Sequence, residues 1–177
     1  MINPKCGKNK DVEMEEQRHL LSILVDNEPG VLSRITGLFS GRGYNIDSLS
    51  VAETVEPNVS RITMVTHGSP GIIEQIKKQL NKLINVIKVM DLTGTQYVLR
   101  EMALIKVNAK AEHRAEILRI SDIFRGQVVD VGIDHFTVKI TGDPEKITAV
   151  LNLLKPMGIR EIARTGCIAL PRENGTK

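Results

Sequence analysis

The sequence predicts an α+β protein in which two ferredoxin-like βαββαβ sandwiches stand in tandem. Three observations predict this fold. Short runs rich in β-forming residues alternate with stretches whose apolar residues recur at helical spacing. The order strand, helix, strand, strand, helix, strand occurs twice within the 177 residues. Turn residues also match between the halves, since Gly-Ser-Pro at 68–70 parallels Gly-Asp-Pro at 142–144 and Phe-Ser-Gly at 39–41 parallels Phe-Arg-Gly at 124–126, which favours a duplication.

The first unit begins with a short apolar strand that ends in turn residues. Its four expected strands are 20–25, 44–54, 60–67 and 86–92. The first helix follows Gly30, because apolar residues recur at helical spacing from Val31 to Phe39. Gly41 and Gly43 can end this helix, since glycine readily adopts positive φ.

A second helix begins at Pro70, with Ser69 as its N-cap. The apolar stripe of this helix comprises Ile73, Ile76, Leu80, Leu83, Ile84 and Ile87, of which the last also falls within the next strand. The candidate core positions of the two middle strands are Ile46, Leu49, Val51, Ile62 and Met64.

The second unit repeats this order around a hairpin at Asp134. Its expected strands are 98–108, 127–133, 135–141 and 159–165, and its expected helices are 112–123 and 144–154. The chain therefore divides into a charged tail at 1–18, a first domain at 19–93, a linker at 94–97, a second domain at 98–171 and a short tail at 172–177.

Composition excludes several classes of protein. A formal net charge of +3 and 3% aromatic residues do not favour a nucleic-acid partner. The apolar runs are too short for a membrane-spanning helix, and the N-terminal tail lacks the apolar segment of a secretory signal. Cys6 and Cys167 are expected to be free thiols in a reducing cytoplasm, where we expect the protein to reside.

No catalytic or metal-binding constellation is expected. The four histidines, at 19, 67, 113 and 135, are scattered and have no neighbouring cysteine. Asp47, Asp91 and Asp130 are isolated carboxylates on expected strands. The sequence therefore does not predict an enzyme.

The turn between the first strand and the first helix is the best candidate for a ligand site. Free N–H groups at a helix N-terminus attract a carboxylate. Gly30 lets a ligand approach the backbone, and the Asn27 side chain offers hydrogen-bond donors and an acceptor. The alternative is that Asn27 only caps the helix and Gly30 only permits the turn. Because such a site is open on one side, we expect a second subunit to close it.

Two stretches carry a family resemblance. Residues 24–34, LVDNEPGVLSR, and residues 37–49, GLFSGRGYNIDSL, closely resemble the ACT domain of acetolactate synthase small subunits. Residues 60–63, SRIT, and residues 123–130, IFRGQVVD, resemble further segments of the same family. The resemblance covers about residues 19–171.

This resemblance implies a non-catalytic regulatory subunit. In that family a separate large subunit carries thiamine diphosphate, a magnesium ion and FAD, and condenses pyruvate with a second 2-keto acid at the start of valine, leucine and isoleucine synthesis. The small subunit raises this activity and makes it sensitive to feedback inhibition by branched-chain amino acids, usually valine. The resemblance places the effector at a homodimer interface of ACT domains, where it is held by Asn27, Gly30, Val31 and Leu32 and covered by Asn45 and Ile46 of the neighbouring subunit.

The second unit is not expected to bind an amino acid in this way. It has Lys-Ala-Glu-His at 110–113 where the first unit has its Asn-x-x-Gly turn, so it is expected to form an interface or transmit the signal. Two other functions remain open. One is a free-standing ACT-domain sensor that regulates a different enzyme or a transcription factor, and the other is an enzyme on a ferredoxin-like fold.

Overall fold

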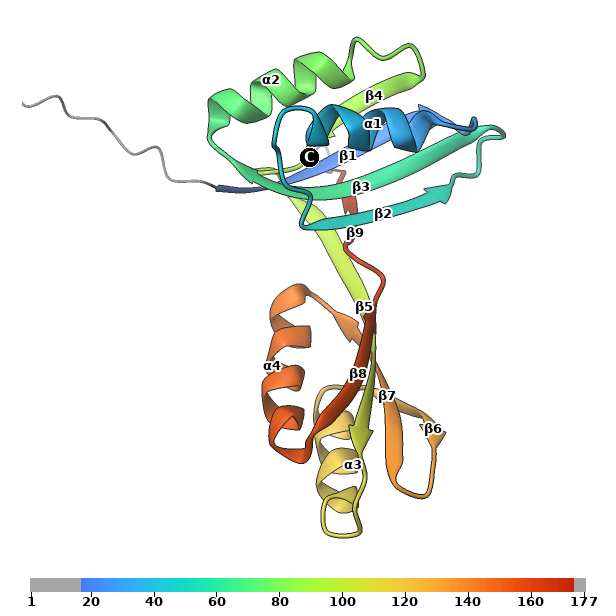
Figure 1. Cartoon of the computed structure of the whole chain (residues 1–177), viewed down its shortest axis with the longest axis vertical. Coiled ribbons are helices and arrows are strands. Elements are labelled where there is room, and N and C mark those ends of the chain that lie inside the picture. The colour runs from blue at the N-terminus through green and yellow to red at the C-terminus, as the bar shows by residue number, and fades with distance from the viewer. Residues whose placement is uncertain (1–16, 174–177) are drawn as a thin grey trace, which may run out of the picture.

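The computed structural model describes residues 17–173, which form two domains stacked along the long axis of the molecule (Figure 1). In each domain two helices cover one face of an antiparallel sheet, so the predicted fold class is confirmed. Most of both expected tails, including Cys6, lies outside the described residues. Within residues 17–173, no helix is both long enough and apolar enough to span a bilayer.

The N-terminal domain has a four-stranded sheet with the strand order β2-β3-β1-β4. Its strands are β1 (Gln17–Asp26), β2 (Ser48–Glu53), β3 (Val59–Gly68) and β4 (Val86–Asp91). Its helices are α1 (Val31–Ser40) and α2 (Pro70–Leu80). Because β3 and β1 are central, β2 and β4 are the edge strands and keep one side of their backbone unpaired within the chain.

The core of this domain lies between its sheet and its helices. Ile62 and Met64 of β3 are fully buried there, as predicted, and the ring of Phe39 from α1 packs edge-on against Tyr44, with ring centroids 6.2 Å apart. The apolar stripe predicted for α2 is wrong at its end. The helix stops at Leu80 and a turn follows, so that Ile84 is 95% exposed. Two further predicted core positions, Ile87 and Val51, are also exposed.

The strand predicted at 44–54 begins four residues later than expected. Local hydrogen bonds hold the preceding segment in a non-strand conformation instead. The Thr66 hydroxyl donates to the carbonyl of Asn45 at 2.6 Å, and the Asn45 side chain donates to the Asp47 carboxylate at 2.7 Å. Side-chain bonds of this kind compete with a strand ladder. Residues 44–47 therefore form a fixed loop that leads into β2.

The C-terminal domain repeats the arrangement with the strand order β6-β7-β5-β8. Its strands are β5 (Tyr97–Asn108), β6 (Gln127–Val131), β7 (His135–Gly142) and β8 (Ile159–Arg164). Its helices are α3 (Arg114–Ile123) and α4 (Pro144–Leu154), followed by one 3₁₀ turn, η1 (Lys155–Met157). The α4 start is as predicted, since the Asp143 carboxylate caps it by accepting a hydrogen bond from the Lys146 N–H at 2.7 Å.

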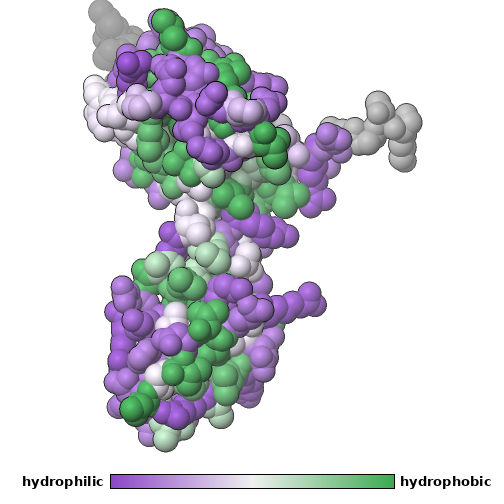
Figure 2. Space-filling view, turned by 90° about the vertical axis from the view of Figure 1, so that its right-hand side faces the viewer, coloured by the Kyte–Doolittle hydropathy of each residue, from purple (hydrophilic) through white to green (hydrophobic). Residues whose placement is uncertain are grey.

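A short strand that the sequence analysis did not predict joins the two domains. This strand, β9 (Ile168–Pro171), pairs with residues 97–100 at the start of β5. The resulting ribbon packs on the face of the N-terminal sheet that lies opposite its helices, and the buried residues of that contact are Leu20, Val65, Leu92, Cys167 and Ala169. The domains thus meet at a narrow junction (Figure 2). Burial raises the pKa of the free Cys167 thiol, which keeps it protonated.

Candidate functional site

The N-terminus of α1 opens into free space. Gly30 is its N-cap, with φ of 85°, a conformation that side chains other than glycine rarely adopt. A Cβ placed on Gly30 would meet no atom within 4 Å. Among the described residues, neither a carbonyl nor a side chain accepts a hydrogen bond from the N–H groups of Leu32 and Ser33. These two amides, with the positive end of the helix dipole, can therefore receive an anion.

A buried asparagine fixes the loop that precedes α1. Asn85 is 8% exposed and stands just before β4. Its carbonyl accepts from the Asp26 N–H at 2.9 Å, and its Nδ2 donates to the Glu28 carboxylate at 2.9 Å. Its Oδ1 accepts from Arg34 of α1, also at 2.9 Å. Asn85 was not predicted from the sequence, because an asparagine before a strand gives no signal of these long-range contacts.

Asn27 binds the end of the edge strand β2. Its Nδ2 donates to the Glu53 carboxylate at 2.6 Å, and its N–H donates to the carbonyl of Asn58 at 2.7 Å. Asn27 therefore does not cap α1, and that alternative is wrong; Gly30 does permit the turn, as the same alternative supposed. Glu53 is a further residue at this site that the sequence analysis missed. The only sequence feature that could have indicated Glu53 was its place near the end of an expected strand.

The other predicted site residues divide into two groups. Val31 is 4% exposed and points into the core, so that only its backbone faces the opening, whereas the Leu32 side chain is 37% exposed. Asn45 and Ile46 follow the far end of α1. A helix of ten residues is about 15 Å long. The fold of one chain therefore brings Asn27, Gly30 and Leu32 together but separates them from Asn45 and Ile46.

Each histidine stands beside a carboxylate. His67 contacts Asp47 at 2.5 Å, and His135 lies 3.2 Å from Asp130, so these aspartates are not isolated as expected. The remaining such pairs are His135–Asp134 at 3.1 Å, His113–Glu112 at 3.5 Å and His19–Asp91 at 3.7 Å, so that Asp91 is not isolated either. Hydrogen bonds from Arg160 and His135 lower the pKa of Asp134 to about 2. Within residues 17–173, no group of three or more His, Cys, Asp or Glu side chains is arranged to hold a metal ion.

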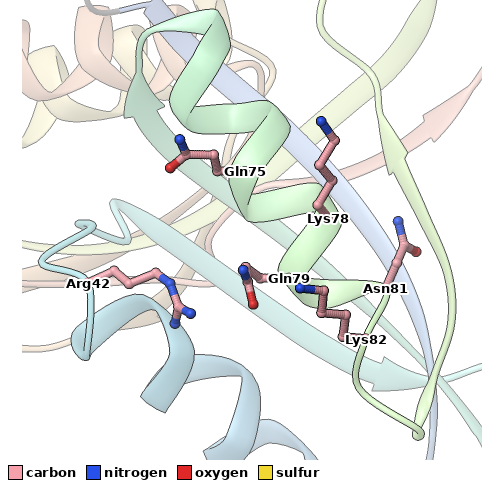
Figure 3. A pocket seen from close by; sticks show the side chains of 6 residues that line it. All are labelled: Arg42, Gln75, Lys78, Gln79, Asn81 and Lys82. Atoms are coloured by element: carbon pink, nitrogen blue, oxygen red, sulfur yellow. The ribbon is translucent and has the colours of Figure 1, made fainter.

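A cationic cleft of about 400 Å³ lies beside α2 (Figure 3). It is lined by Arg42, Gln75, Lys78, Gln79, Asn81 and Lys82. Lys77 and Lys78 lie in the last turn of α2, where cations offset the negative end of the helix dipole. Lys78 is also paired with Glu74 one turn earlier, at 3.4 Å. The charge of Lys78 in this cleft thus has a structural explanation.

A second cleft, of about 430 Å³, lies between the domains. The Glu101 carboxylate in its wall is only 3% exposed and accepts two hydrogen bonds of 2.6 Å from Arg164. This pairing raises the pKa of the Arg164 guanidinium, which therefore stays charged. The sequence did not indicate this ion pair, because its two members lie 63 residues apart.

Comparisons with known proteins cover both domains. A family model described as "AHAS small subunit-like ACT domain" matches residues 21–88, and one described as "Small subunit of acetolactate synthase" matches residues 100–173. A probable acetolactate synthase small subunit of Methanothermobacter thermautotrophicus is 49% identical over 93% of this chain and 99% of its own length. The acetolactate synthase small subunit of Aquifex aeolicus is 51% identical over 91% of this chain and 84% of its own length.

A solved structure agrees with these relatives. The crystal structure of the acetolactate synthase small subunit from Thermotoga maritima superimposes with a TM-score of 0.83 and 42% sequence identity, covering 89% of this chain and 99% of that one. The similarity to these proteins, in sequence and in fold, therefore extends along nearly the whole described chain. This chain belongs to the acetolactate synthase small-subunit family.

Proposed function

We propose that this chain is the regulatory subunit that activates a thiamine-diphosphate-dependent acetolactate synthase large subunit and makes it sensitive to feedback inhibition by branched-chain amino acids, with valine as the expected effector. The observation that carries this proposal is the open N-terminus of α1, whose free amides stand next to the edge strand β2. Family membership supports the large subunit as its partner.

The effector's two charged groups match the two sides of the opening. Its carboxylate accepts hydrogen bonds from the N–H groups of Leu32 and Ser33, and it can come close because Gly30 has no side chain. Its ammonium group faces the Asn27 Oδ1 and the Glu53 carboxylate, which lie together at the end of β2. The Leu32 side chain and the Val31 backbone border the ligand. A charge-assisted hydrogen bond contributes about 1.5–3 kcal/mol, so two of them, at about 3–6 kcal/mol together, suffice for a site with Kd in the range from millimolar to tens of micromolar.

Pairing of two β2 edges in a homodimer would complete the site. In an antiparallel, two-fold arrangement the end of one β2 lies opposite the start of the other. Asn27 is bonded to Glu53 at the end of β2, while Asn45 and Ile46 lie three and two residues before its start at Ser48. The partner's 45–46 segment would therefore cover the Gly30 opening. This geometry supports the assignment of Asn45 and Ile46 to a site that a single chain leaves incomplete.

The chain itself performs no catalysis under this proposal. Thiamine diphosphate, magnesium and FAD belong to the large subunit, which condenses pyruvate with a second 2-keto acid in the cytoplasm on the way to valine, leucine and isoleucine. Effector bound between two N-terminal domains favours one dimer arrangement, and the large subunit prefers another. A difference of about 1–3 kcal/mol between the arrangements produces a five- to 150-fold effect.

Reconstitution tests this function. We expect the chain to co-purify with the large subunit, to raise its rate of acetolactate formation from pyruvate, and to confer inhibition by valine that the large subunit alone lacks. The isolated chain should show no turnover of pyruvate. Recovery of a different enzyme or a transcription factor, with binding of the amino acid intact, would instead support a free-standing sensor. Turnover by the isolated chain would refute a regulatory role.

A further inference from the structure

The loop assigned to effector closure leads directly into a contact with the other domain. Ser48 is the first residue of β2 and lies two residues after Ile46. Its hydroxyl oxygen accepts a hydrogen bond of 3.0 Å from the backbone N–H of Cys167, in the segment between β8 and β9. This bond joins residues 119 positions apart.

Gly166 packs against the same point of β2. A Cβ placed on Gly166 would lie 2.8 Å from the Ser48 hydroxyl oxygen, which is too short for a carbon atom, and 3.1 Å from the Leu49 carbonyl oxygen, which is a tight contact. The φ of Gly166 is 76°, so its backbone also requires glycine. The domains therefore touch here through backbone atoms and the Ser48 hydroxyl group.

Side-chain and backbone contacts connect both ends of this contact to neighbouring strands. On the N-terminal side, the loop is fixed to β3 by the Thr66 hydroxyl and by the contact between His67 and Asp47. On the C-terminal side, Thr165 and Met102 of β5 exchange two hydrogen bonds, from the Thr165 N–H at 3.0 Å and from the Met102 N–H at 3.1 Å. The Ser48–Cys167 bond therefore gives a shift of the 45–48 segment a direct path to the β8–β9 connection, beside the apolar contact between the domains.

We propose that Ser48 and Gly166 are positioning residues that couple the effector site to the orientation of the C-terminal domain. This inference rests on the proposed function. When a partner's effector engages Asn45 and Ile46, the start of β2 moves with them, and the Ser48–Cys167 bond carries that displacement into the β8–β9 connection. Neither residue touches the effector. Their effect is on the response to the effector and not on its affinity.

The other connection between the domains provides a matched control. Gly94 lies between β4 and β5 and has φ of 74°, nearly that of Gly166. A Cβ placed on Gly94 would meet no atom within 4 Å. Gly94→Ala and Gly166→Ala therefore impose a similar strain at φ, but only the second presses on Ser48. Ser50→Ala controls for Ser48→Ala, since Ser50 lies two residues along β2 and on the same face.

The experiment measures valine binding by calorimetry on the full regulatory chain and inhibition on the enzyme reconstituted with the large subunit. Ser48→Ala and Gly166→Ala are expected to keep the valine Kd within about threefold of wild type, while the ratio of uninhibited to inhibited rate falls at least about fivefold. Valine should change the hydrogen exchange of the Cys167 amide in the wild type but not in Ser48→Ala. The Gly94→Ala and Ser50→Ala variants should behave as wild type in all three measurements.

Three results would overturn the coupling. Full inhibition of Ser48→Ala and Gly166→Ala at wild-type valine affinity would show that the contact transmits nothing. A parallel loss of binding and inhibition would make Ser48 part of the binding site. An equal loss of inhibition in Gly94→Ala would show that backbone strain, and not the contact with Ser48, causes the loss in Gly166→Ala. A wild-type chain that binds no branched-chain amino acid would instead refute the proposed function, and the inference with it.

Discussion

Replacing Gly30 with Asp is expected to abolish feedback inhibition while leaving activation of the large subunit intact. The new side chain would project into the space that the effector carboxylate needs, since a Cβ at this position meets no other atom. Its negative charge would compete for the N–H groups of Leu32 and Ser33 and repel the effector. Loss of one charge-assisted hydrogen bond, at about 1.5–3 kcal/mol, weakens binding by about tenfold to 150-fold. The valine concentration giving half-maximal inhibition should rise by at least this factor.

A matched substitution separates this effect from backbone strain. Gly94→Asp introduces the same charge at nearly the same φ, far along the chain from α1, and should leave inhibition unchanged. Asn27→Ala should weaken valine binding by about tenfold, because the substitution removes the partner of Glu53 and one polar contact with the ligand. Normal valine sensitivity of Gly30→Asp would show that the effector binds elsewhere.

Replacing Arg164 with Ala is expected to cause the largest loss of stability. Glu101 is 3% exposed and depends on Arg164 for both of its side-chain hydrogen bonds. Removing one member of a buried pair leaves an unpaired charge, which costs about 3–5 kcal/mol. Because the Arg164 side chain is itself 41% exposed, we expect the lower end of that range. For a chain of this size, about 3 kcal/mol lowers Tm by about 6–12 °C, measured by thermal unfolding.

Two further variants test the origin of this loss. The double variant Glu101→Leu with Arg164→Met should recover most of the lost stability, because an apolar pair of similar size leaves no buried charge. Arg119→Ala removes an exposed ion pair with Glu116 on α3 and should leave Tm nearly unchanged. A loss below about 1 kcal/mol in Arg164→Ala would mean that water reaches Glu101 and replaces its partner.

Local sequence patterns predicted the fold because the spacing of apolar residues in most segments matches the face that the segment buries. Apolar residues at helical spacing correctly gave α1, and Asp143 followed by Pro144 correctly gave the start of α4. The prediction failed where distant contacts decide the structure. Ile84 continued a helical pattern, but α2 ends at Leu80 and the chain turns toward β4. Strand β9 forms only because the start of β5 lies beside it, which four residues of sequence cannot indicate.

The part of the candidate site that local sequence determines was predictable. The part that depends on contacts between distant residues was not. A glycine before a helix indicated both the turn and the open amides around Gly30. The contacts of Asn27 with Glu53, of Asn85 with Glu28, and of Ser48 with Cys167 join segments 26, 57 and 119 residues apart. Such pairs carry no sequence periodicity. They become visible only in the folded chain, where the ends of β2 and β4 lie near the loop before α1 and the β8–β9 connection meets the start of β2.

The structure of the homodimer with bound valine tests the central claim most directly. We expect the valine carboxylate within hydrogen-bond distance of the N–H groups of Leu32 and Ser33, and Asn45 of the second subunit on its opposite side, across two paired β2 strands. Valine bound anywhere else, or a dimer in which both β2 edges remain open, would contradict the account.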